Sequence, residues 1–303
     1  MRYRAICSEG TIVSCLSLTL SPDPTRRRPS DWTAVIFAAL ESGVNCFEVA
    51  TFDPVVVGGL AEALAAVDRR LVFVCWRLGQ AAGAGGRRRD VSADGLADQV
   101  ATALAASGLD RLDAVLLDEP GQGEVAAEAL ATLRALRSAG TVRFLGVRGE
   151  TDAIDGYMAS GAFDILATPF NLTSGWRERN RLRTASARDM AVIGYDAYPR
   201  DFHAAATAAA KAAKGQGGWK NPLAGAGSYG FLDSTRGWTG EEICLSYVLT
   251  EPSLATIGLE PSSIEHLGKL AEVPEREMPP GLAAQIEMAR FAPLPPAEIK
   301  RRA

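Results

Sequence analysis

The sequence predicts an α/β fold, a single (β/α)8 TIM barrel, and two observations favour it. Short apolar runs such as 71–75 and 114–117 lack the alternation of a half-exposed strand, so they are typical of parallel strands buried on both faces. Helix-like segments follow these runs at nearly regular spacing, and eight such units close naturally into a barrel. With 303 residues, 47% of them hydrophobic, the chain can bury one large core, so we treat 1–303 as a single domain.

The elements follow in order along the chain. Residues around Gly10 are expected to form an N-terminal β-hairpin, and the first barrel strand is expected at 16–20. Asp31 is a good cap for a helix that runs to Ser42. Beyond it we expect strands 43–49, 70–76, 113–118, 142–147, 164–168, 190–195 and 254–259, and helices 55–67, 93–107, 123–138, 151–160, 176–188, 239–250 and 262–272.

Two segments stand outside this alternation. The connection 199–238, after the seventh strand, is too long for an ordinary loop. We expect an Ala-rich helix over 203–214 in it, and a lid or pocket wall as its role. Residues 276–303 are expected to form a C-terminal helix and tail that close the chain.

Composition excludes some kinds of partner. The net charge of -4 argues against nucleic acid or an anionic membrane surface, because both require a clustered positive field. The basic run 87–89 is therefore interpreted as a solvated loop. Five scattered cysteines without C-x-x-C spacing are expected to be small core residues. Their odd number, and the lack of a signal peptide or an apolar run of about 18 residues, favour a cytoplasmic protein.

The stretch 43–53 carries the first candidate site. Gly43 ends a helix-like run, and the β-rich segment after it contains Glu48 and leads to Asp53. In a barrel of alternating strands and helices, the carboxyl ends of the strands form the functional face. By the same reasoning, Arg77, Asp118 and Arg148 follow or end other strands. We expect all five side chains to converge on one mouth.

Several phrases, in the correct order, resemble the aldo-keto reductase superfamily. They are 43–50 (GVNCFEVA, similar to G-I-N-x-F-D-T-A), 107–113 (SGLDRLD, similar to L-G-x-D-Y-I-D), 139–147 (AGTVRFLGV, similar to A-G-K-V-R-Y-I-G-V) and 169–172 (PFNL, similar to Y-N-L). The likeness extends over nearly the whole chain and is weakest in 199–238. It implies an (α/β)8 barrel that uses NADP(H).

The residues that carry this family's catalysis are replaced. The resemblance implies an Asp, Tyr, Lys and His tetrad, and these positions fall on Glu48, Asp53, Arg77 and Asp118. A census that needs no alignment agrees: the first lysine is Lys211, no tyrosine lies between Tyr3 and Tyr157, and neither histidine is on the fourth strand. The usual proton-transfer residues are therefore absent.

The cofactor positions implied by the resemblance are also altered. Where the family holds the nicotinamide amide with Ser-Asn and Gln, this chain has Arg148-Gly149 and Ala167. The tyrosine that stacks on the ring matches Tyr195. The positions at which a cofactor would be held are Arg148, Asn171, Tyr195, Ser262 and Ser263.

The positions that would bind the cofactor phosphates carry negative charge in this chain. Asp196 replaces a usual serine and Glu260 a usual glycine, and a carboxylate at either position would oppose a pyrophosphate. Ser262 and Ser263, at a helix start, could still contact phosphate, but a capping box with Glu265 is the role we expect for them.

Three interpretations of the acids and arginines stay open. They could form an ion-pair network that plugs an emptied cofactor cavity, with Arg148 filling the nicotinamide space. Arg77 and Arg148 could instead clamp a polar or anionic small molecule. Or one acid of raised pKa could act as general acid or base. No metal is expected, because there is no His or Cys cluster and the arginines would oppose a cation.

The favoured hypothesis is a non-reducing pseudoenzyme, without cofactor, that binds a small molecule or a protein partner. The alternative is an active enzyme on the same fold. It would be either an atypical NADP(H)-dependent oxidoreductase or a carboxylate-based lyase, isomerase or hydrolase.

Overall fold

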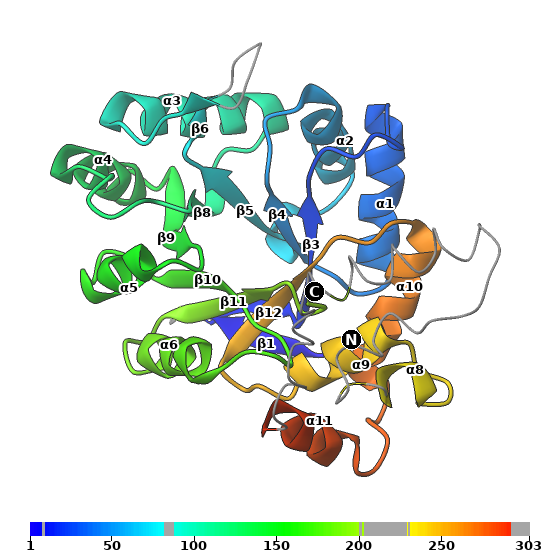
Figure 1. Ribbon diagram of the computed structural model, residues 1–303. Helices are drawn as coiled ribbons and strands as arrows, with labels where there is room; N and C mark the ends of the chain where they lie inside the picture. The colour runs from blue at the N-terminus through cyan, green and yellow to red at the C-terminus, as the bar shows by residue number, and fades with distance from the viewer. Residues whose placement is uncertain (8–9, 82–87, 200–201, 203–228, 230, 292–303) are drawn as a thin grey trace, which may run out of the picture.

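The centre of the molecule is a closed barrel of eight parallel strands. The computed structural model describes residues 1–7, 10–81, 88–199, 202, 229 and 231–291. Around the barrel the strands follow the order β10-β11-β12-β3-β4-β5-β8-β9, which confirms the predicted fold (Figure 1). Their bounds are β3 Leu16–Leu20, β4 Cys46–Val49, β5 Phe73–Leu78, β8 Leu112–Asp118, β9 Val142–Arg148, β10 Ile165–Pro169, β11 Ala191–Tyr195 and β12 Leu254–Leu259.

Each strand serves two apolar clusters, because successive side chains point to opposite faces. In β5, Phe73 and Cys75 pack in the barrel interior, while Val74 and Trp76 pack in the layer between barrel and helices. This double burial explains why the strands are continuous apolar runs in the sequence. The alternation also directs the next residue, Arg77, into the barrel.

Helices form a ring outside the strands (Figure 1). The helices between strands are α1 Pro29–Glu41, α2 Pro54–Ala65, α3 Ala93–Ser107, α4 Ala127–Ser138, α5 Asp152–Ala159, α6 Trp176–Ser186 and α9 Gly240–Val248, and α10 Ile264–Glu272 follows the last strand. Two further helices are α8 Phe231–Ser234 and α11 Leu282–Phe291, and 3-10 turns lie at Arg69–Leu71 and Val273–Glu275. No helix in the described part of the chain is long and apolar enough to cross a membrane.

Some boundaries differ from the sequence-based expectation. Helix α1 begins at Pro29, and Asp31 lies inside it, where its carboxylate accepts the backbone N–H of Arg28 at 3.0 Å. Helix α4 begins at residue 127, not 123, because Glu124 instead accepts the N–H of Gly121 at 2.7 Å within a loop. Strand β5 extends two residues beyond the expected end at 76, to Leu78.

The connection between β5 and α3 was expected to be a loop without strands. After β5 the chain forms a short antiparallel hairpin, β6 Gln80–Ala81 with β7 Arg88–Arg89. Residues 88 and 89 of the basic run, which was interpreted above as a solvated loop, therefore form a strand. Arg89 makes specific contacts with the loop after β8, so the interpretation was wrong for this residue.

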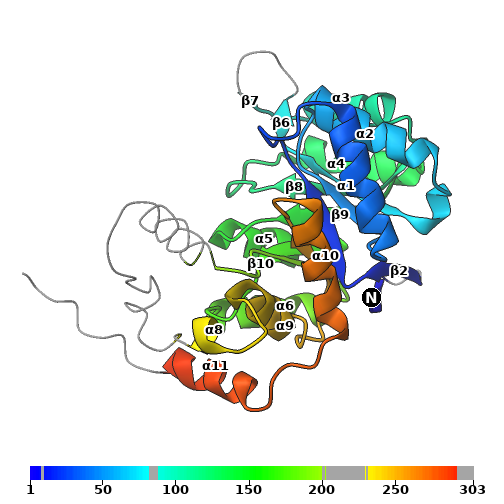
Figure 2. The ribbon, with the colours of Figure 1, turned by 90° about the vertical axis from the view of Figure 1, so that its right-hand side faces the viewer.

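The N-terminal hairpin closes the end of the barrel where the strands begin (Figure 2). It pairs β1 Tyr3–Ile6 with β2 Thr11–Ser14. The backbone N–H of Ser14 donates to the side chain of Asn45 at 2.7 Å, just before β4, and Arg4 donates to the carbonyl of Leu249 at 2.7 Å. The open face is therefore the opposite end, where the strands finish. The Ala-rich helix expected at 203–214 and the tail 292–303 lie outside the described residues.

Candidate functional site

The last inward-facing side chains of four neighbouring strands carry alternating charges. Glu48 comes from β4, Arg77 from β5, Asp118 from β8 and Arg148 from β9, and these strands are adjacent in the barrel in that order. The register places Asp118 directly beside Arg148. We call these four residues the charge ring. The structure thus brings together four of the five residues expected to converge.

Ion pairs connect the members of the charge ring. Arg77 Nε donates to Glu48 Oε1. Arg148 lies 3.5 Å from the same oxygen through Nε and donates from Nη1 to Asp118 Oδ1 at 2.9 Å. The site is largely dry, since the side chains of Glu48 and Arg148 are only 2% and 12% exposed. Each guanidinium therefore has a carboxylate partner, as buried charges require.

Arg148 also stacks on the aromatic ring of Tyr195. Its guanidinium carbon lies 3.8 Å from the ring centroid, which is a close cation–π contact. Burial on its own lowers the pKa of Arg148, but the negative charges of Glu48 and Asp118 help to hold the pKa above its usual value. Burial raises the pKa of the Tyr195 hydroxyl, so the tyrosine stays neutral. The arginine is therefore a permanent cation on a neutral ring.

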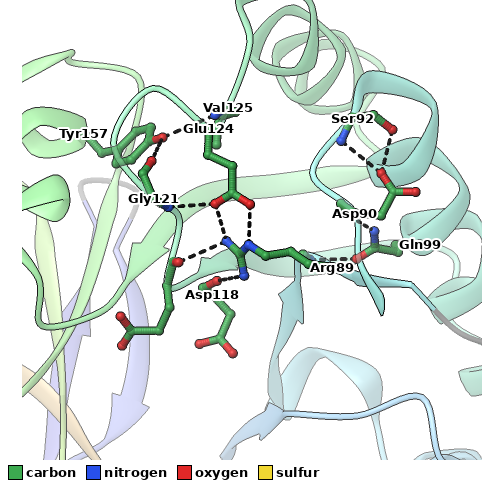
Figure 3. A network of polar contacts seen from close by, with 11 residues as sticks. Arg89, Asp90, Ser92, Gln99, Asp118, Gly121, Glu124, Val125 and Tyr157 are labelled. Carbon is green, nitrogen blue, oxygen red and sulfur yellow. Dashed lines mark hydrogen bonds and ion pairs between the residues drawn. The ribbon is translucent and has the colours of Figure 1, made fainter. Parts of the chain in front are cut away.

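A second network fixes the backbone around Asp118 (Figure 3). From β7, Arg89 donates to the carbonyl oxygens of Asp118 and Glu119 at 2.9 and 3.0 Å and to the carboxylate of Glu124 at 2.8 Å. Glu124 in turn holds Gly121, whose carbonyl accepts the hydroxyl of Tyr157 at 2.7 Å. The hairpin thus positions the end of β8, and with it the Asp118 carboxylate that faces Arg148.

A cavity of about 120 Å³ opens beside the charge ring. Arg77, Arg148 and Tyr195 form part of its wall. The remaining lining residues are Thr19, Asp196, Ala197, Tyr198, Glu241, Leu245, Gly258, Leu259, Glu260 and Leu270. It therefore joins cationic, anionic and aromatic groups in a small space.

The acidic side of this cavity is nearer the solvent than the arginines. Glu260, directly after β12, is an exposed residue, whereas Arg77 and Arg148 are mostly buried. Even so, its carboxyl group is partly desolvated, and this together with nearby Glu48 and Asp196 raises the pKa of Glu260. The sequence marked Glu260 only as an unusual replacement of a glycine, and its place on the rim of a cavity required the fold.

Other candidate residues have structural contacts elsewhere. Asp53 does not join the charge ring in the described contacts, since its carboxylate caps α2 by accepting N–H groups of Val55 and Val56 at 2.9 and 3.3 Å. Asn171 donates from its amide to the carbonyl of Asp196 at 3.1 Å. The side-chain oxygen of Asn171 accepts the backbone N–H of Thr173 at 3.0 Å and so closes a turn.

The two serines after β12 are engaged at the start of α10. Ser263 caps this helix by accepting the N–H of His266 at 3.1 Å. The oxygen of Ser262 lies 3.1 Å from the ring nitrogen Nδ1 of the same histidine. A serine thus caps the helix as expected, but the residue three positions after Ser263 is His266, so the expected capping box with Glu265 does not form among the described contacts.

Two buried thiols lie beneath the charge ring. Cys46 and Cys75 face the barrel interior. Burial, reinforced by the negative charge of Glu48, raises the pKa of both thiols above the usual value. They stay protonated at neutral pH and are not nucleophiles.

A barrel of this topology, with functional residues at the carboxyl ends of its strands, belongs to a large class of α/β enzymes and their relatives. Within that class, the sequence identifies one family. The model of the aldo/keto reductase family matches residues 20–289, so the chain belongs to this family. No curated protein sequence matches it.

Solved structures agree with this assignment at the level of the fold. The chain is similar to the aldo-keto reductase AKR11C1 from Bacillus halodurans in its holo form, with 16% identity, 98% of this chain and 99% of that chain covered, and a TM-score of 0.75. It is also similar to the glycerol dehydrogenase AKR11B4 from Gluconobacter oxydans, with 18% identity, 95% and 94% coverage and a TM-score of 0.71.

Proposed function

We propose that this protein is a non-reducing member of the aldo/keto reductase family that binds a polar small molecule in place of a nicotinamide cofactor. The observation that carries the proposal is the stack of Arg148 on Tyr195 at 3.8 Å. By resemblance, Tyr195 is the tyrosine on which the family stacks the nicotinamide ring. The guanidinium covers one face of this ring, which supports the proposal that it takes the place of the nicotinamide.

The surrounding residues do not fit NADP(H). Arg148 pairs with Asp118 and Glu48, so displacing it would leave Asp118 without an ion-pair partner among the described residues and Glu48 with Arg77 alone. The adjoining cavity carries Asp196 and Glu260, which would repel a pyrophosphate. Its volume of about 120 Å³ is close to that of cavities that hold a single benzene, and so is small for a nicotinamide nucleotide.

The positions of the catalytic tetrad are committed to other contacts. Glu48 and Arg77 bind each other, Asp118 binds Arg148, and Asp53 caps a helix. None of these side chains is a phenol or an ammonium that could give a proton to a carbonyl as the family tyrosine and lysine do. In this proposal, other residues therefore occupy both the position of the proton donor and the binding position of the nicotinamide ring.

A titration with NADPH and NADH, followed by cofactor fluorescence, tests the proposal directly. We expect no saturable binding in the micromolar range and no NADPH oxidation over a panel of aldehydes. An active aldo-keto reductase is the positive control for both assays. Tight saturable binding, or aldehyde reduction above the heat-inactivated control, would overturn the proposal and favour an atypical NADP(H)-dependent oxidoreductase.

A further inference from the structure

We propose that the cavity beside the charge ring binds a small neutral molecule that carries a primary carboxamide group. The inference rests on the proposed function, because a nicotinamide on Tyr195 would compete for the same space. It goes further by assigning the chemical class of the ligand. The polar atoms at the buried end of the cavity, the balance of charge around it and its volume together define this class.

The buried end of the cavity presents two oxygen atoms that can accept hydrogen bonds. Gly258 and Thr19 both line the cavity, and a Cβ on Gly258 would lie 3.1 Å from Thr19 Oγ1 and 3.9 Å from Glu48 Oε2. Because glycine has no side chain, both oxygens are left beside the cavity. Glu48 Oε2 is buried and has no hydrogen-bond partner among the described residues. A buried carboxylate oxygen is costly to leave unpaired, so a ligand at this end should donate to it.

The same end of the cavity also presents hydrogen-bond donors. Arg77 lines the cavity, and among the described residues it bonds only to Glu48, through Nε. Its two terminal nitrogens are therefore able to donate to a ligand. A ligand at this end needs an acceptor for Arg77 together with donors for Glu48 and Thr19.

A primary carboxamide combines these functions in one group. Its oxygen accepts hydrogen bonds, and its NH2 group has two hydrogens to donate. The oxygen would accept from Arg77, and the two hydrogens would serve Glu48 Oε2 and Thr19 Oγ1. An alcohol has only one hydrogen to donate, a ketone has none, and a carboxylate would place a negative charge beside Glu48. The carboxamide therefore fits the buried end better than these alternatives.

The charges around the cavity favour a ligand without net charge. The two arginines of the charge ring are matched by its two carboxylates. At the rim, Glu260 interacts electrostatically with both arginines. Glu241 already contacts His266 Nε2 at 3.0 Å, and Asp196 has a contact of its own. An anionic ligand would compete with Glu260 for the arginines, and a cationic ligand would face them, so a neutral ligand disturbs the site least.

The volume and the remaining wall set the size of the ligand. About 120 Å³ suits roughly five non-hydrogen atoms, because a cavity of about 150 Å³ holds one benzene. Buried apolar side chains form another part of the wall, namely Ala197, Leu245, Leu259 and Leu270. They can pack on a short alkyl group. Propionamide, a carboxamide with an ethyl group, has the required size.

The test compares propionamide with molecules of similar shape and different hydrogen-bonding groups. Calorimetric titrations of the full chain use propionamide, butanone, which has no donor, propanol, which has one, and propionate, which is charged. We expect propionamide to bind at millimolar concentration, roughly tenfold more tightly than each of the others, because each leaves a polar atom of the site without a partner. Nicotinamide should not bind at the same concentrations, since its ring exceeds the cavity. Equal affinity for any comparison molecule, nicotinamide included, or no binding of propionamide would overturn the inference.

Variants locate the binding site. Thr19→Val removes a hydroxyl with little change of shape, so it should weaken propionamide several-fold and leave butanone unaffected. Thr168→Val is its control, because Thr168 is also buried but is not among the residues that line the cavity. Gly258→Ala should weaken every ligand by filling space. Glu48→Gln should reverse the preference, since an amide donor would then favour propionate. Unchanged propionamide affinity in both Thr19→Val and Gly258→Ala would contradict the assigned site, even if Glu48→Gln does not fold.

The outcome is independent of the cofactor assay. Binding of NADPH would refute the proposed function whatever the amides do. Absence of both NADPH and amide binding would refute only the carboxamide inference.

Discussion

The pair of Arg148 and Asp118 should be energetically coupled, and a double-mutant cycle with Arg148→Met and Asp118→Asn measures the coupling. The Nη1 to Oδ1 distance is 2.9 Å, and the two side chains are 12% and 16% exposed. Methionine keeps most of the apolar volume of arginine but cannot pair, and asparagine keeps the shape of aspartate without its charge. The two substitutions therefore remove the interaction with little change in packing.

The magnitude follows from what each single variant leaves behind. Arg148→Met leaves Asp118 without an ion-pair partner among the described residues and Glu48 with Arg77 alone. Breaking a fully buried pair costs about 3–5 kcal/mol, and the partial exposure here lowers our expectation to about 2–4 kcal/mol. Asp118→Asn leaves Arg148 close to Glu48, so we expect a loss of about 1–2 kcal/mol.

The assay is urea unfolding of the four proteins, followed by circular dichroism. The double variant should be little worse than Arg148→Met, which gives a coupling of about 1–2 kcal/mol. The control is Arg143→Met on the same strand. Arg143 lies 4.8 Å over the ring of Phe144 and outside the charge ring, so its loss should leave the coupling between Arg148 and Asp118 unchanged. Additive losses, with coupling under about 0.5 kcal/mol, would refute the assignment of Asp118 as the partner that holds Arg148.

Three further predictions concern Glu260, Cys7 and Asp53. Glu260 has a raised pKa in the folded state, so its favourable contribution is present below the ordinary carboxyl range and lost as pH rises. Glu260→Gln should therefore be more stable than the parent at pH 7 in urea melts, and an advantage that persists unchanged at pH 4 would contradict this sign. In a thiol titration of the native protein, only the half-buried Cys7 should react quickly and Cys7→Ser should abolish that phase, because the other four cysteines are buried. Asp53→Ala should cost about 1 kcal/mol through loss of the α2 cap and leave the coupling of Arg148 unchanged; a changed coupling would place Asp53 in the ring after all.

The fold was accessible from the sequence because it depends on repeated local signals. Apolar runs, their spacing and the helix-like segments between them recur along the chain, so an error at one boundary does not change the topology. The wrong start of α4 is such an error: residues 123–126 are compatible with a helix, but Glu124 instead holds a loop that Arg89 also binds.

The candidate site was only partly accessible. Strand alternation was enough to bring Glu48, Arg77, Asp118 and Arg148 together, since each is the last inward residue of its strand. The prediction that Asp53 joins these residues was wrong because Asp53 lies beyond β4, where a carboxylate before Pro54 caps the next helix. The contacts of Arg89 could not be predicted for another reason. Its partners are backbone carbonyls and Glu124, more than 25 residues away, and no local pattern indicates such a contact.

The alternation of charge around four neighbouring strands also constrains how this protein can change in evolution. Every member of the charge ring contacts an oppositely charged residue on an adjacent strand, so replacing one of them removes a charged partner from its neighbour in a mostly buried site. The effect of a substitution here should depend strongly on its ion-pair partner. Substitutions should therefore be tolerated mainly when both residues of an oppositely charged pair change together. In homologous sequences, covariation between positions 118 and 148 and between 48 and 77 would record that constraint.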